Sequence, residues 1–171
     1  METRQVGCSG LRVSRLGLGT MTWGRDTPAE NAHALLEMFC EAGGTLIDTA
    51  AAYGAGDAER IVGKLIRELG NRDEVVIATK AGFVIRDGKR IVDTSRRALL
   101  RDLDGSLRRL QSDYIDLWQI HAWGEAPVEE SLDAMDYAVS TGRVRYAGVS
   151  NFVGWQTAQA ATWQRAFPSR T

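Results

Sequence analysis

Short apolar runs alternate along this chain with longer stretches of helical periodicity. The runs are short and apolar enough to be strands buried in a parallel sheet. They cover residues 16–19, 45–47, 75–79, 116–120 and 146–149. Each run is followed by apolar residues spaced as on one face of an amphipathic helix, over residues 32–39, 58–69, 99–110, 128–139 and 155–165. The pattern predicts five strand-then-helix units, and a small hairpin before them in residues 5–15.

The predicted helices have start and stop signals in the sequence. Thr27 and Pro28 supply an N-cap and a first-turn proline for the first helix. A cap for the third helix lies within residues 93–95. Gly70 and Gly142 end the second and fourth helices, because glycine adopts the left-handed conformation that closes a helix. These signals support separate helices between the strands.

Two architectures are compatible with parallel strands joined by helical crossovers. One is an open doubly wound sheet, and the other is an incomplete (β/α)8 TIM barrel of about five units. A complete barrel needs about 250 residues, so the length of 171 residues favours the open sheet. No linker or internal repeat interrupts the pattern, and residues 1–171 are predicted to form a single domain of the α/β class.

The positions of the polar residues favour the barrel instead. Asp48 follows the second strand, with Tyr53 in the loop after it. Lys80 follows the third strand, His121 follows the fourth, and Ser150-Asn151 follow the fifth. In a barrel the carboxyl ends of the strands converge on one mouth, where active sites are built. In an open sheet the same residues would lie along a line.

The four ionisable side chains suit the delivery of a proton to a carbonyl oxygen. A tyrosine phenol is a poor acid near neutral pH, and a nearby ammonium favours its phenolate form. Lys80 is the candidate for that ammonium, Asp48 for its ion-pair partner, and His121 for a neutral hydrogen-bond donor. The set contains no nucleophile paired with a base and no metal-ligand spacing. Reduction of a carbonyl also needs a reductant, and none of these side chains is one. A hydride cofactor is therefore implied.

Composition excludes several other classes of protein. Hydrophobic residues make up 44% of the chain, charged residues make up 25%, and the net charge is −1 with the two signs interspersed. A nucleic-acid binder would carry a basic stripe. No apolar run approaches the roughly 18 residues of a membrane span, and charges interrupt the first residues, unlike a secretory signal. With Cys8 and Cys40 as its two cysteines, the chain has no disulfide framework, and a cytoplasmic location is expected.

Several of these segments resemble the aldo-keto reductase family. The matching segments occur in the family's order over essentially the whole chain: 16–24 (LGLGTMTWG), 47–54 (IDTAAAYG), 78–80 (ATK), 113–117 (DYIDL) together with His121, and 148–152 (GVSNF). The resemblance implies an incomplete TIM barrel and the transfer of a hydride from NADPH to an aldehyde or ketone. It implies Tyr53 as the general acid, Lys80 as the residue that tunes it, Asp48 as the partner of Lys80, and His121 as the residue that orients the carbonyl.

The resemblance also implies where a cofactor and a substrate bind. Ser150 and Asn151 would hydrogen-bond the nicotinamide carboxamide. The nicotinamide ribose would lie beside Gly19, Thr20, Met21 and Asp48. The loops that carry Trp23, Phe83 and Trp123 would wall the substrate pocket. NADH is not excluded by these residues, and no metal is implied.

Each of these residues also has a purely structural explanation. Asp48 could cap the following turn, and Ser150-Asn151 could cap the fifth helix. Lys80 could be a solvated charge and His121 a partly buried histidine without chemistry. The three pocket aromatics could equally pack within their loops. Trp155 and Trp163 are expected in the core or in an interface.

Three functions remain open at this stage. The chain is expected to be a carbonyl reductase, a cofactor-sensing subunit of a larger assembly that turns over weakly, or an inactive fragment. The family's further strands complete the barrel and hold the rest of the cofactor. The first and last strands of this chain would otherwise be open edges. The missing half of the barrel or another chain is therefore expected to cover them.

Overall fold

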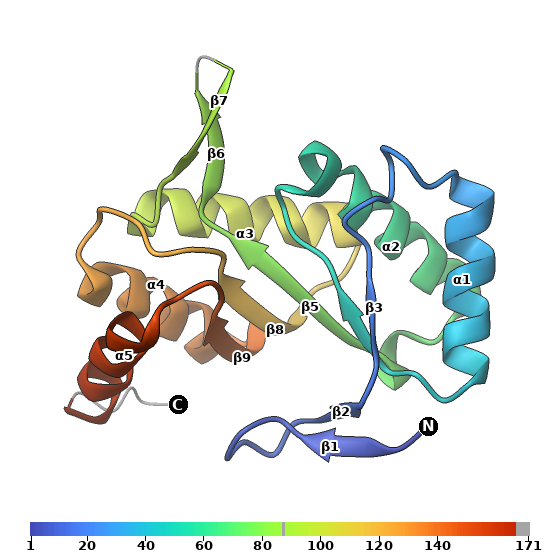
Figure 1. The fold of residues 1–171 in the computed structure, drawn as a ribbon, viewed down its shortest axis with the longest axis horizontal. Helices are drawn as coiled ribbons and strands as arrows, with labels where there is room; N and C mark the ends of the chain where they lie inside the picture. Colours follow the sequence, from blue (N-terminus) through green and yellow to red (C-terminus); the bar gives the residue numbers. More distant parts are fainter. Residues whose placement is uncertain (87, 167–171) are drawn as a thin grey trace.

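A parallel sheet forms the centre of the molecule, which a computed structural model describes for residues 1–86 and 88–166. Within these residues five strands pair side by side in sequence order: β3 (Gly17–Gly19), β4 (Leu46–Asp48), β5 (Val76–Ala81), β8 (Ile115–Ile120) and β9 (Val144–Val149). Every neighbouring pair is parallel. The five predicted strands are therefore confirmed, each within a few residues of its expected range (Figure 1).

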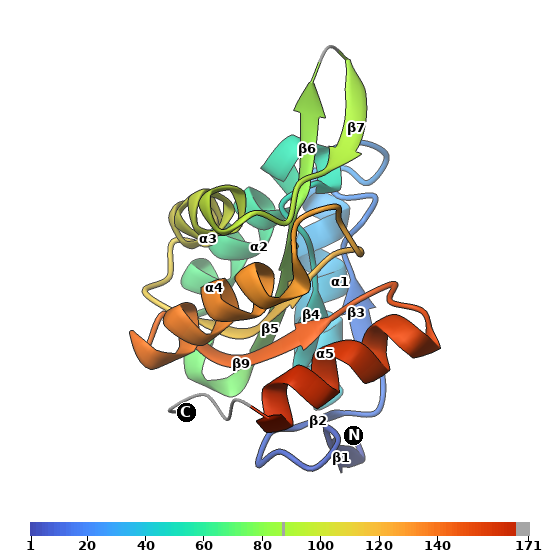
Figure 2. The same cartoon turned by 90° about the vertical axis from the view of Figure 1, so that its left-hand side faces the viewer.

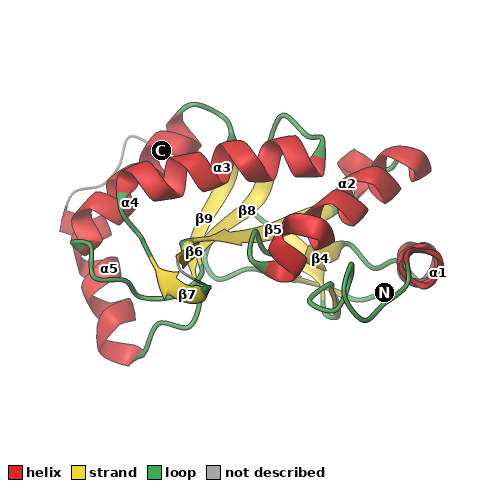
Figure 3. Cartoon of the chain, turned by 90° about the horizontal axis from the view of Figure 1, so that it is seen from above, coloured by secondary structure: helices red, strands yellow, loops and turns green. Residues whose placement is uncertain are grey.

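One helix follows each of these strands, and each helix after the first packs on the helix before it. The helices are α1 (Ala29–Glu41), α2 (Asp57–Leu69), α3 (Arg96–Leu110), α4 (Val128–Ser140) and α5 (Gly154–Ala166). Seen from above, they follow one another around the outside of the row of strands (Figure 3). A doubly wound sheet would have helices on both faces, so the arrangement is that of a barrel segment. None of the described helices is long and apolar enough to cross a bilayer.

The core lies between the sheet and this layer of helices. Trp118 on β8 is fully buried, as expected of a packing residue. Helix α2 shows a complete apolar stripe, and the left-handed Gly70 ends it as predicted. Ser95 caps α3 by accepting a hydrogen bond from the amide of Ala98. The predicted second, third and fourth helices are thus confirmed.

Two antiparallel hairpins extend the sheet scaffold. The first pairs β1 (Thr3–Gln5) with β2 (Arg12–Ser14), as the sequence predicted. The second pairs β6 (Phe83–Arg86) with β7 (Lys89–Val92) and projects from the body of the molecule (Figure 2). This second hairpin was not predicted, although the sequence contains Asp87-Gly88, a dipeptide typical of two-residue hairpin turns.

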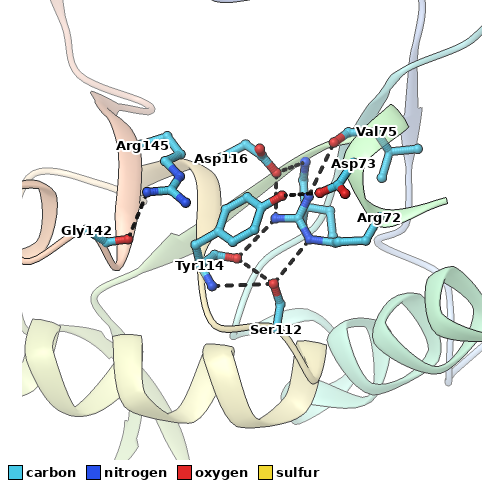
Figure 4. A network of polar contacts seen from close by, with 9 residues as sticks. Arg72, Asp73, Val75, Ser112, Tyr114, Asp116, Gly142 and Arg145 are labelled. Atoms are coloured by element: carbon cyan, nitrogen blue, oxygen red, sulfur yellow. Dashed lines mark hydrogen bonds and ion pairs between the residues drawn. The ribbon is translucent and has the colours of Figure 1, made fainter. Parts of the chain in front are cut away.

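A polar network joins the loops that lead into β5 and β8 (Figure 4). The Arg72 guanidinium pairs with Asp116 at 2.8 Å, and it donates to the Ser112 hydroxyl at 3.1 Å and to the carbonyl of Tyr114 at 3.1 Å. The Tyr114 ring lies between two guanidinium groups, with Arg72 at 4.0 Å and Arg145 at 4.5 Å from its centroid. These contacts fix the strands at the end opposite to their carboxyl termini.

Several local predictions are wrong. Thr27 does not cap α1, because its hydroxyl bonds the Thr22 hydroxyl at 2.8 Å and the helix begins at Ala29 behind Pro28. Leu35 was expected in the apolar stripe of α1, yet 45% of its surface is exposed. Trp155 was expected in the core or an interface; it is 62% exposed, so the core alternative is wrong and the interface stays a prediction.

Ser150 and Asn151 do not cap α5 either. The helix begins later, at Gly154. The Val153 amide before it donates to the side-chain oxygen of Gln156 at 2.9 Å. Gln156 therefore does the capping from inside the first turn, and the two polar residues after β9 have other partners.

Candidate active site

The carboxyl ends of three neighbouring strands bring four ionisable side chains together. Asp48 is the last residue of β4, Lys80 lies near the end of β5, and His121 directly follows β8. Tyr53 begins the short 3-10 helix η1 (Tyr53–Gly56) after β4. Because the strands are parallel and in continuous register, these positions share one edge of the sheet. The convergence expected of a barrel mouth is present.

Lys80 is the centre of this group. Its ammonium nitrogen lies 2.7 and 2.8 Å from the two carboxylate oxygens of Asp48 and 2.9 Å from the carbonyl oxygen of Thr49. The same nitrogen lies 3.4 Å from the hydroxyl oxygen of Tyr53. Lys80 is 6% exposed, so its ammonium is largely shielded from water, whereas the Asp48 side chain is 38% exposed. Asp48 and Thr49 thus hold the ammonium of Lys80 next to the hydroxyl of Tyr53.

His121 lies on the other side of the phenol. Its ring centroid is 5.9 Å from that of Tyr53 in an edge-to-face arrangement and 4.4 Å from that of Phe83. Burial, together with the charges of Lys80 and Arg90, lowers the pKa of His121 to about 4, against a weaker opposing effect of Asp48. The imidazole is therefore neutral at ordinary pH. Its buried Nδ1 has no hydrogen-bond partner among the residues that the structure describes.

The loop that carries Tyr53 is held by an unusual backbone and by Trp23. Gly54 and Ala55 have left-handed φ angles of 55° and 53°. A Cβ on Gly54 would meet the carbonyl oxygen of Trp23 at 3.3 Å. Trp23 itself is 1% exposed and belongs to the hydrophobic core. A role for Trp23 in the wall of the substrate pocket stays a prediction, and the burial of its side chain does not favour it.

A cavity of about 380 Å³ opens beside two of the four residues, Tyr53 and His121. Tyr53, His121 and Phe83 line it, so Phe83 is placed where a substrate wall was predicted. Trp123 is not among its lining residues. Its ring instead packs edge-to-face on Phe152 at 5.1 Å and on Trp155 at 5.2 Å, beside a neighbouring cavity of about 1000 Å³. A role for Trp123 in substrate binding stays a prediction.

Two arginines in the lining of this cavity were missed by sequence reasoning. Arg25 comes from the loop after β3, and Arg90 comes from β7 of the projecting hairpin. No strand-end position marks either residue. The Asp-Gly dipeptide was the one signal that could have predicted the hairpin and hence the place of Arg90.

The candidate cofactor residues lie around the same mouth. Thr20 is buried, and both its amide and its hydroxyl donate to the carbonyl oxygen of Asp48, at 3.0 and 3.1 Å. Met21 is 57% exposed and lines the cavity. A Cβ on Gly19 would meet nothing within 4 Å, so the backbone there is open to a ligand. Gly19 and Met21 thus leave an open rim, whereas Thr20 is buried, and the contact of these residues with a nicotinamide ribose stays a prediction.

Asn151 and Ser150 form the opposite part of the rim. Asn151 has a left-handed φ of 56°, and its side-chain nitrogen donates to the His121 carbonyl at 2.9 Å and to the Ser150 hydroxyl at 3.1 Å. The Asn151 side chain is thus anchored to the backbone of His121. An amide and a hydroxyl fixed in this way fit the hydrogen-bonding groups of a carboxamide. No cluster of three or more metal-ligating side chains occurs in residues 1–86 and 88–166.

Comparison with known proteins gives consistent matches. The model of the Aldo/keto reductase family matches residues 15–168. The chain is 40% identical over 162 residues to aldo-keto reductase YhdN of Bacillus subtilis (strain 168), which covers 89% of this chain and 47% of that protein. It is 37% identical over 163 residues to a probable voltage-gated potassium channel subunit beta of Oryza sativa subsp. japonica, which covers 94% of this chain and 49% of that protein.

A solved structure shows the same fold. The aldo-keto reductase AKR11C1 from Bacillus halodurans, in its holo form, matches with a TM-score of 0.81 and 37% sequence identity, over 89% of this chain and 51% of that one. The chain thus spans about half the length of the relatives that it matches. The predicted incomplete TIM barrel is confirmed. The chain belongs to the aldo/keto reductase family.

Proposed function

We propose that this chain forms the catalytic face of an oxidoreductase that transfers a hydride from NADPH to an aldehyde or ketone, with Tyr53 as the proton donor. The observation that carries the proposal is the 3.4 Å separation between the Lys80 ammonium and the Tyr53 hydroxyl, with Lys80 held by Asp48. His121 lies beside the same phenol. A cation and a neutral imidazole thus lie close to the same proton donor, and the phenol and the imidazole line one cavity.

The chemistry of each residue follows from its surroundings. When the Tyr53 hydroxyl gives its proton to a carbonyl oxygen, the ammonium of Lys80 stabilises the phenolate that remains. Asp48 keeps Lys80 in place through two short contacts. His121 is neutral, so it can donate a hydrogen bond to the carbonyl oxygen without becoming the acid itself.

A nicotinamide cofactor, when bound, would supply the hydride that the side chains lack. Ser150 and Asn151 would hold its carboxamide. The residues that would border its ribose are Gly19, Thr20, Met21 and Asp48. NADPH as the preferred cofactor and a cytoplasmic location rest on the family resemblance.

Tyr53→Phe tests this proposal because it removes only the hydroxyl. Oxidation of NADPH in the presence of an aldehyde panel is followed by the loss of nicotinamide absorbance. We expect the variant to lose activity by a factor of about 100 or more, the usual contribution of a general acid. Tyr137→Phe, at a tyrosine that is 43% exposed on α4, is the matched control. Full activity in Tyr53→Phe would sink the proposal.

A second candidate function is a cofactor-sensing subunit. The similarity to a protein named as a potassium channel subunit beta favours it. NADPH binding measured by fluorescence, without turnover of any aldehyde, would support this candidate. The absence of both binding and turnover would support an inactive fragment.

We also infer that further barrel strands cover both edges of the sheet in the active enzyme. In the described part of the chain, β3 and β9 each pair with a strand on one side only. Strand edges exposed in this way invite pairing with other chains. The covering strands could belong to the same polypeptide or to another copy.

A further inference from the structure

The charges around the candidate active site are unbalanced. Arg25 and Arg90 both line the cavity that contains Tyr53 and His121, and no carboxylate is among the described residues of its lining. Arg25 pairs with its neighbour Asp26 at 2.6 Å, so its charge is already compensated. No ion pair of Arg90 with a described carboxylate is found. Among the described residues, Arg90 is therefore the guanidinium at the cavity wall that has no carboxylate partner.

Ring contacts link Arg90 to the reacting end of the cavity. Its guanidinium carbon lies 4.5 Å from the centroid of the Phe83 ring, and that ring lies 4.4 Å from the ring of His121. His121 in turn contacts Tyr53 edge-on. Arg90, Phe83, His121 and Tyr53 thus follow one another along one wall. A guanidinium that lies over a ring can still offer N–H groups to a ligand.

The hairpin register explains why Arg90 and not its neighbour faces the site. Ile85 pairs with Arg90 and Phe83 pairs with Val92 across the two strands. Paired residues of antiparallel strands lie on the same face, and successive residues alternate between faces. Phe83 and Arg90 therefore share a face, and Lys89 lies on the other. Arg90 is also close enough to affect the site electrostatically, because its charge helps to lower the pKa of His121.

We propose that Arg90 is a specificity-determining residue that binds an anionic group of the carbonyl substrate. The enzyme then prefers aldehydes or ketones that bear a carboxylate or another oxyanion over neutral analogues of the same shape. The inference rests on the proposed function and adds the class of substrate to it. Guanidinium groups bind carboxylates through paired, charge-assisted hydrogen bonds, and such bonds are stronger in a partly enclosed site than in water.

Two aldehydes that differ in one charge test the preference. With the full chain and NADPH, kcat and KM are measured for 4-carboxybenzaldehyde and for its neutral methyl ester, methyl 4-formylbenzoate. We expect Arg90→Met to raise KM for the carboxylate by about tenfold or more, the loss typical of one charge-assisted pair, and to leave the ester unchanged. Equal losses for both substrates would make Arg90 a packing residue and overturn the proposal.

Lys89→Met is the matched control, because it removes the same charge from the same hairpin on the face away from the cavity. We expect it to preserve the preference for the carboxylate. Arg90→Lys retains the charge without the planar guanidinium, and we expect it to keep part of the preference. If Lys89→Met lowers the preference as much as Arg90→Met does, the effect comes from the general field of the hairpin and the proposal fails.

A binding measurement separates this inference from the proposed function. If the wild-type chain reduces neither aldehyde, the proposed function fails, and calorimetry with benzoate and benzamide still tests Arg90. These two probes have the same shape and differ in charge. We expect tighter binding of benzoate by wild type, and equal binding of both by Arg90→Met. Equal affinity of wild type for the two probes would overturn the inference.

Discussion

His121 reports most directly on the environment of the candidate site. Burial and the neighbouring cations Lys80 and Arg90 lower its pKa to about 4 from an ordinary value of 6.5. An NMR titration of the imidazole is expected to give a midpoint near the lower value. Arg90→Met should raise the midpoint, since one repelling charge is lost, whereas Lys89→Met should not. A wild-type midpoint near 6.5 would contradict the enclosed position of the ring.

The same residue links folding to pH. Between about pH 6.5 and pH 4 the unfolded chain binds a proton at His121 that the folded chain does not bind. The free energy of unfolding therefore decreases as the pH falls through this window. We expect a contribution of about 3 kcal/mol from this residue, because each pKa unit corresponds to about 1.4 kcal/mol. Urea unfolding at pH 7 and pH 4 should show a steeper loss in wild type than in His121→Gln, and equal losses in the two proteins would refute the link.

Side chains at strand ends were predictable from the sequence, and those on the projecting hairpin were not. Asp48, Lys80 and His121 each follow an apolar run, so the topology of a parallel barrel alone predicts that they converge. Arg90 stands 10 residues after Lys80 along the chain, and its place in the cavity depends on how an antiparallel hairpin is oriented. The burial of Trp23 was not predictable either, because the sequence of a loop does not show which way an aromatic ring points.

Helices α2 and α3 and strand β5 are joined by a charged group that the sequence does not reveal. Glu59 of α2 is fully buried, accepts from the Thr79 hydroxyl at 2.5 Å, and pairs with Arg109 of α3 at 2.6 Å. Loss of one partner leaves a buried charge uncompensated. We expect Arg109→Met to lower the free energy of unfolding by about 3 kcal/mol. Denaturant unfolding measures this change.

The control for Arg109→Met is Arg60→Met, which breaks an ion pair with Asp57 whose side chains are 57% and 53% exposed. An exposed pair of this kind contributes about 0.5 kcal/mol. The double variant Glu59→Gln/Arg109→Met should recover part of the loss, because a neutral amide still accepts from Thr79. If Arg109→Met lowers the free energy of unfolding by no more than Arg60→Met does, the buried pair does not stabilise the contact between the helices.

The close approach of α2 to α3 depends on Gly63. A Cβ at this position would lie 2.6 Å from the Cα of Leu110. Alanine is the better helix former by about 1 kcal/mol, but the clash with backbone outweighs this gain. We expect Gly63→Ala to destabilise the fold by about 2 kcal/mol. Gly154→Ala, where a Cβ meets nothing within 4 Å, should have little effect on thermal unfolding, and a stabilised Gly63→Ala would show that the helices can separate.

Periodicity predicted the regular elements because burial imposes it on both strands and helices. It did not predict the exposed hairpin β6–β7, whose strands bury little surface. It also missed η1, in which Gly54 and Ala55 are left-handed. The start of α1 moved because the Thr27 hydroxyl bonds the Thr22 hydroxyl, five residues earlier, and does not cap the helix. A local signal fails where another contact competes for the same side chain.

At the scale of the whole molecule, the central and outer strands of the sheet differ in how their backbone is protected. Strands β5 and β8 are paired on both sides, whereas β3 and β9 are paired on one side within the described residues. Amide exchange is slow where hydrogen bonds break only on cooperative opening, and it is fast where a strand can fray. Protection should therefore decrease from the centre of the sheet to its two edges.

Hydrogen–deuterium exchange on residues 1–171 tests this gradient. We expect the amides of β5 and β8 to exchange most slowly and those of β3 and β9 at least about tenfold faster, a difference of about 1.4 kcal/mol in opening free energy. Sedimentation at the same concentration distinguishes a monomer from an assembly that covers the edges. Uniform protection in a monomer would contradict the prediction of open edges. Protection of the edge strands that rises with protein concentration would mean that another copy pairs with them, because a second chain supplies the missing hydrogen bonds.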